Sequence, residues 1–140
     1  MALLIDKNLT VLGDIDLAQL YVRLTISYGP GGTSLIVRSD PYASKVAYDA
    51  DSNNNIFPVI GINSLQQLAY DRVADGSDIL TFVHDKIKTN LSTDITQEEP
   101  LPDPSTGEEQ IDPSTGEIIM HTVIITPKFA QDSSISIVDL

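Results

Sequence analysis

The sequence predicts a mainly β protein: an antiparallel sandwich- or barrel-like sheet, one α-helix near 78–91, and a long acidic loop near 94–117. Three observations lead to this fold class. Apolar residues alternate along 20–28, they recur at helical spacing along 79–91, and 94–117 holds eight acids, four prolines and no base. The length of 140 residues fits a single domain spanning 1–140, with 94–117 as a loop or arm within it.

The best predicted β-hairpin spans 20–39. Its first strand places Leu20, Val22 and Leu24 on one face and Tyr21 and Arg23 on the other, which is typical of a half-buried strand. The Gly-Pro-Gly-Gly run at 29–32 permits a turn, and 34–39 returns as the second strand.

Four other segments are predicted to be strands, and the run 118–126 is the most β-prone in the chain. They are 9–12, an edge strand at 56–62 that carries Pro58, the β-prone run 118–126, and the alternating segment 134–140. Residues 43–48 fit either a short strand or an irregular edge. Residues 65–73 fit a helix and a strand equally well.

The single predicted helix covers 78–91. Ser77 or Asp78 can cap its start, and one apolar stripe follows, formed by Ile79, Phe82, Val83, Ile87 and Leu91. On this helix His84 should lie off the apolar stripe, beside Asp85.

The acidic segment 94–117 contains a direct repeat, Asp-Pro-Ser-Thr-Gly-Glu, at 103–108 and again at 112–117. Each copy has the composition of a turn, because Asp caps it, Pro presets φ and Gly takes a left-handed conformation. A long loop of this kind is commonly functional or disordered, and here we expect a contact with another protein.

Composition excludes several classes of function. The net charge is −12, so attraction to nucleic acid or to an anionic membrane is not expected. The absence of cysteine excludes disulfides, thiolate metal sites and cysteine nucleophiles. No apolar run is long enough for a transmembrane helix, and the N-terminal run is too short for a signal peptide.

No catalytic, metal or cofactor site is predicted, and we expect no enzymatic activity. The start of a calcium loop at Asp49, Asp51 and Asn53 lacks the required Gly and Glu further along. The two histidines, His84 and His121, have no neighbouring nucleophile motif or second histidine in the sequence.

Candidate partner-binding residues come from two places. Tyr21 and Arg23 lie on the face opposite the apolar one, where exposed aromatic and Arg side chains often anchor interfaces. A Tyr that is buried or half-buried in the core is the more frequent explanation, and if this face is covered, a second subunit is the expected cover. The acids of the arm predict a basic receiving surface. These acids are Glu98, Glu99, Asp103, Glu108, Glu109, Asp112 and Glu117.

The opening 7–15, KNLTVLGDI, resembles short N-terminal strand-and-turn sequences of tailed-bacteriophage fibre, neck and baseplate proteins. The acidic composition without Cys or Trp, and the late DPSTGE turns, are similar to small virion proteins of that class. The resemblance implies a symmetric homo-oligomer that is assembled in the host cytoplasm and attached to other proteins of the virion.

The first functional hypothesis is therefore a structural subunit of an assembly. An adaptor, collar, tail or decoration protein fits better than a complete fibre, because coiled-coil and β-helical repeats are absent. The alternative is a free-standing β-sandwich module that binds a ligand or carbohydrate. The lack of Trp and the 6% aromatic content weigh against sugar stacking.

Overall fold

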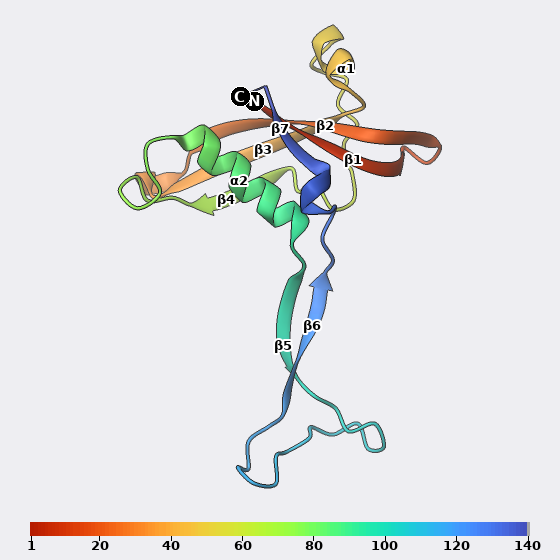
Figure 1. The fold of residues 1–140 in the computed structure, drawn as a ribbon, viewed down its shortest axis with the longest axis vertical. Coiled ribbons are helices and arrows are strands. Elements are labelled where there is room, and N and C mark those ends of the chain that lie inside the picture. Colours follow the sequence, from red (N-terminus) through yellow and green to blue (C-terminus); the bar gives the residue numbers. More distant parts are fainter. Residues whose placement is uncertain (140) are drawn as a thin grey trace. The chain divides into compact units, whose positions relative to one another are not determined.

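The computed structural model describes residues 1–139, and it confirms a mainly antiparallel β protein (Figure 1). Contacts divide the chain into two compact units: a sheet unit formed by 1–92 and 129–139, and an arm unit formed by 93–128. The elements are β1 Ala2–Val11, β2 Ile15–Tyr28, β3 Ser34–Tyr42, α1 Lys45–Ala50, β4 Leu65–Ala69, α2 Ile79–Ser92, β5 Ile95–Pro100, β6 Met120–Thr126 and β7 Ile135–Val138, with 3₁₀ turns at Pro30–Gly32 and Asp132–Ser134.

The sheet unit is built on five antiparallel strands in the order β4-β3-β2-β1-β7. The predicted hairpin is confirmed, and Tyr28 of β2 pairs with Leu35 of β3 next to the Gly-rich turn. Within the predicted strand at 134–140, Ile135–Val138 form β7, which pairs with β1, and Leu140 lies outside the described residues. The strand candidate at 9–12 is the end of a longer strand, because β1 begins at Ala2.

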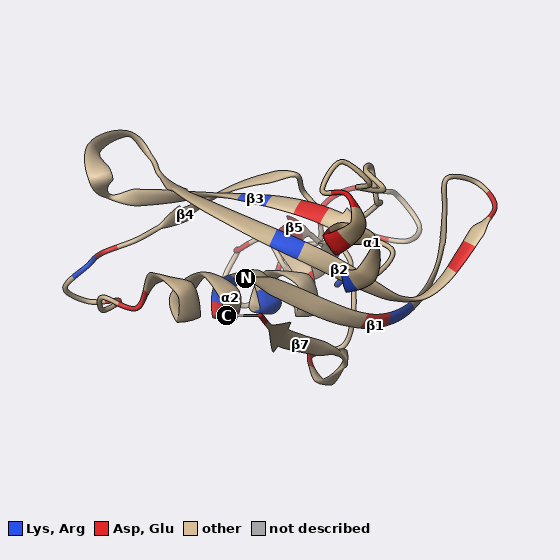
Figure 2. Ribbon diagram, turned by 90° about the horizontal axis from the view of Figure 1, so that it is seen from above, with Lys and Arg blue, Asp and Glu red and all other residues tan. Residues whose placement is uncertain are grey.

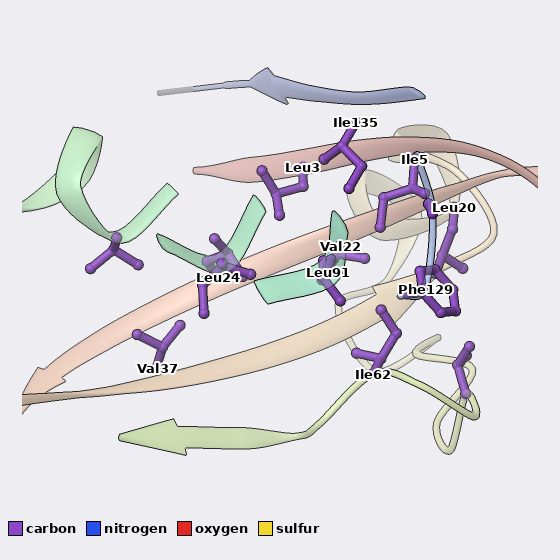
Figure 3. Packing of buried hydrophobic residues seen from close by; sticks show 14 of the residues in the cluster. Leu3, Ile5, Leu20, Val22, Leu24, Val37, Ile62, Leu91, Phe129 and Ile135 are labelled. Atoms are coloured by element: carbon purple, nitrogen blue, oxygen red, sulfur yellow. The ribbon is translucent and has the colours of Figure 1, made fainter. Parts of the chain in front are cut away.

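The hydrophobic core lies between the apolar face of this sheet and α2. The predicted alternation holds, since Leu20, Val22 and Leu24 are buried. Figure 3 shows side chains of β1, β2, β7 and α2 gathered in one cluster. The helix is confirmed at Ile79–Ser92, and its residues Val83, Ile87 and Leu91 join that cluster because they recur on one helical face.

Helix α2 differs from its prediction at His84. This residue was expected off the apolar stripe, but its side chain is fully buried. The buried face includes position 84 as well as 83, 87 and 91, so it is wider than the predicted stripe. The ring Nδ1 lies 2.6 Å from the carbonyl oxygen of Leu80, and burial lowers the pKa of His84 below its usual value.

Two segments predicted as strands have other structures. Residues 45–50 form helix α1, because Ser44 caps it by accepting a hydrogen bond from the Ala47 amide, and Lys45 pairs with Asp49 one turn later. Residues 56–62 form an irregular segment with a cis peptide bond before Pro58 and a left-handed residue at Gly61. The ambiguous region 65–73 is a strand only in β4, Leu65–Ala69.

The arm unit begins and ends with paired strands. Residues 118–126 were predicted as a strand, and β6 occupies 120–126 of them. The preceding segment 94–117 is more ordered than the predicted loop. Its first part is β5, which pairs antiparallel with β6, and two short turns follow it.

Candidate functional site

The arm unit has no interior of its own. None of its residues is buried, and six large apolar side chains are exposed. These are Ile95, Ile111, Ile118, Met120, Ile124 and Ile125. A two-stranded ribbon is marginally stable in water by itself, and contiguous exposed apolar patches in proteins often serve as contact surfaces.

The two DPSTGE copies form the same turn twice. In the first copy an Asp103 carboxylate oxygen accepts hydrogen bonds from the Ser105 amide at 2.8 Å and the Ser105 hydroxyl at 2.6 Å. In the second copy Asp112 accepts the corresponding bonds from Ser114 at 2.8 and 2.7 Å. These hydrogen bonds lower the pKa values of both aspartates, because they stabilise the charged form.

The backbone closes each turn and then joins the turns to the strands. The Gly107 amide donates to the Asp103 carbonyl, and the Gly116 amide to the Asp112 carbonyl, both at 2.8 Å. Three residues spaced nine apart form a ring of hydrogen bonds: the Leu101 amide donates to Ile119, Ile119 to Gln110, and Gln110 to Leu101. The nine-residue repeat therefore has a structural counterpart, with one strand pair and two turns around this ring.

The predicted partner-binding acids fall into three groups. Asp103 and Asp112 hold the turns, as described above. Glu98 accepts a hydrogen bond from the Thr122 hydroxyl at 2.6 Å, and Glu99 accepts one from Gln97 at 3.0 Å. The remaining three have exposed side chains with no partner in the described part of the chain: Glu108, Glu109 and Glu117. The third group is free to meet a partner.

The charge of the arm unit has almost one sign. It holds eight acidic side chains and one base, Lys128, so its net charge is 1 − 8 = −7. The sheet unit holds seven bases and twelve acids, a net charge of 7 − 12 = −5. Both units are therefore acidic in net charge.

Tyr21 is buried, which agrees with the more frequent of the two explanations that the sequence left open, but its cover is not a second subunit. Its side chain is 1% exposed and packs with Tyr42 and Tyr48, and its hydroxyl donates to Asp139 at 2.7 Å. Burial raises the pKa of Tyr21. The cover comes from α1 of the same chain, which the sequence did not predict.

Arg23 is half-buried on the same face. Its guanidinium lies over the Tyr48 ring, 4.6 Å from the ring centre, so α1 also covers part of this side chain. That Arg23 binds a partner remains a prediction.

Neither histidine belongs to a recognisable reactive cluster. His84 is buried in the core, and His121 lies in β6 opposite Glu99. Within residues 1–139 there is no group of three or more His, Asp or Glu side chains placed to hold a metal ion. No helix in that range has both the length and the apolar character needed to cross a membrane.

Comparison with known proteins gives no relative. No protein-family model, curated protein or solved structure matches this chain.

The exposed isoleucines of the arm are the site residues that sequence reasoning missed. Their strand pattern was visible, but the pattern does not tell whether a second layer covers the strand.

Proposed function

We propose that this chain is a non-enzymatic structural subunit of a larger protein assembly, a component of a tailed-bacteriophage virion such as an adaptor, collar, tail or decoration protein. The observation that carries the proposal is the arm unit, which has no buried residue, exposes six large apolar side chains and has a net charge of −7. A segment of this kind gains stability when another protein covers it.

The receiving surface has a defined chemistry. It is apolar where it meets the exposed isoleucines, and it carries Lys or Arg opposite Glu108, Glu109 and Glu117. Opposite charges steer the encounter and fix the register of binding. Since both units of this chain are acidic, the receiver is a different protein of the same assembly.

The direct test is mass spectrometry of purified virus particles from the source of this sequence. We expect peptides of the chain at a fixed stoichiometry to the other particle proteins. We also expect slower hydrogen exchange along 95–126 in the particle than in the free protein. A particle preparation that lacks the chain contradicts the virion assignment, and an arm that exchanges equally fast in both states contradicts its role as the contact.

A pair of matched variants tests whether the acidic side chains of the arm contribute to the contact. The double change Glu108→Gln and Glu117→Gln removes two charges that hold no internal contact. It should lower incorporation into particles severalfold, and added salt should do the same to the wild type. The control, Asp14→Asn with Asp85→Asn, removes two exposed charges from the sheet unit. Equal behaviour of the two variants removes the arm charges from the contact.

A further inference from the structure

Part of one edge of β2, along 25–28, has no strand beside it among the described residues 1–139. Pairing of β1 with β2 ends at Ala2 and Arg23, and the Leu24 amide donates to the Met1 carbonyl at 3.1 Å. Beyond that point 25–28 still pairs with β3 on one side, but no described strand lies on the other. Because backbone groups alternate along a strand, the amide and carbonyl groups of Ile26 and Tyr28 face this open edge.

An apolar groove runs beside the open edge. It has a volume of about 440 Å³, and its lining contains no acidic side chain. Tyr28 lies at its border with 65% of its surface exposed, although the sequence places this residue on the apolar face. The apolar lining comes from Met1, β2, β3 and the start of α2, and the polar side chains of β2 border it. The lining residues are Met1, Arg23, Leu24, Thr25, Ile26, Ser27, Tyr28, Leu35, Ile79 and Leu80.

The edge carries none of the features that keep strand edges apart. Residues 25–28 read Thr-Ile-Ser-Tyr, with no charge and no proline, and all but Ser favour strands. Arg23 is the last charged residue of β2, and the end of β2 that leads into the turn is uncharged in Figure 2. In a chain of net charge −12, two copies repel one another over most of their surface, so an acid-free edge is a place where they can meet.

We propose that this edge of β2 pairs with the same edge of a second copy across a two-fold axis. The free backbone groups select the register. Leu24 is already bonded to Met1, so Ile26 of one copy faces Tyr28 of the other, and each such pair exchanges two hydrogen bonds. Ser27 then lies opposite Ser27 of the second copy.

The same register accounts for the groove. Ile26 and Tyr28 project to the groove side of the sheet, so each Tyr28 ring lies beside Ile26 of the other copy and enters its groove. Cross-strand pairs of an aromatic and a β-branched residue are stabilising. A two-fold contact of this type is self-complementary and closed. It extends the proposed function but uses no residue of the arm.

The absence of cysteine allows a sharp test. In the proposed register the Cα atoms of the two Ser27 residues are about 4.5 Å apart, within the range that a disulfide spans. The two Thr25 residues are about 13 Å apart, four residues at about 3.3 Å each. Ser27→Cys should therefore form a reducible covalent dimer at least about tenfold faster than Thr25→Cys under mild oxidation. Both side chains are exposed on the same face of the same strand.

A second variant tests the hydrogen bonds. Tyr28→Pro removes an amide that faces the open edge and leaves the pairing of β2 with β3 in place. It should weaken the non-covalent dimer in sedimentation experiments, and circular dichroism should show an unchanged fold. Equal cross-linking of Ser27→Cys and Thr25→Cys overturns the proposed edge dimer. So does a wild-type dimer that Ser27→Cys does not trap, although the arm-based function would then stand.

Discussion

At the scale of residues, His84 gives the fold a pH dependence. Burial lowers its pKa in the folded protein, so between that value and about 6.5 the unfolded chain binds a proton that the folded chain does not. The stability conferred by neutral His84 is complete above about pH 6.5. It declines as the pH falls from there to the folded pKa.

The variant His84→Gln isolates this contribution, because Gln stays neutral throughout. We expect the unfolding free energy of the wild type to fall more steeply than that of the variant from pH 7.5 to pH 5.5. Urea titrations at several pH values measure both slopes. Parallel slopes would show that His84 does not couple protonation to folding.

Substitution of Gly61 and Gly76 by Ala distinguishes the cost of backbone strain from the cost of a steric clash. Both have positive φ, but a Cβ at Gly61 would lie 2.6 Å from Cδ2 of Phe129, whereas one at Gly76 meets nothing within 4 Å. Ala at either site should cost about 1 kcal/mol for the left-handed conformation. Gly61→Ala should cost about 1–3 kcal/mol more for the clash. Thermal or urea unfolding compares them, and equal losses contradict the packing of Phe129 against Gly61.

At the scale of elements, the sequence predicts those segments whose apolar residues recur at strand or helix spacing. It does not predict features that depend on a cap or on packing against other elements. The 20–39 hairpin and α2 could be read from the sequence because their apolar faces repeat at strand and helix spacing over many residues. Helix α1 could not, since its six residues carry no apolar stripe and depend on the Ser44 cap. The exposure of the apolar side chains of the arm could not be predicted either. It depends on whether another part of the protein packs against the arm, and the local sequence pattern does not show this.

The two DPSTGE turns should depend on the hydrogen bonds that their aspartates accept. Replacing Asp103 and Asp112 with Ala removes the acceptors of both Ser amides and hydroxyls. Backbone hydrogen exchange at Gly107 and Gly116 should then become several-fold faster. Glu108→Gln with Glu117→Gln should leave that exchange unchanged, because those side chains hold no contact. If the Glu variant loosens the turns equally, the division between turn-forming and free acids is wrong.

At the scale of the whole molecule, the charge distribution predicts opposite salt dependence for the two proposed contacts. The basic partner that we propose for the arm would bind it by attraction, so salt should weaken that contact. Two copies that meet at the β2 edge each have a net charge of −12, so salt screens their repulsion and strengthens the dimer. Two copies of such an acidic chain would repel each other except where their surfaces lack acidic side chains.

The absolute mass in solution, measured by light scattering over a concentration series at low and high salt, tests most directly whether this chain is built to assemble. Our account predicts a rise from the chain mass of 15.2 kDa to twice that value, at lower protein concentration when salt is high. A mass of 15.2 kDa at every concentration and salt level would contradict self-assembly through the β2 edge.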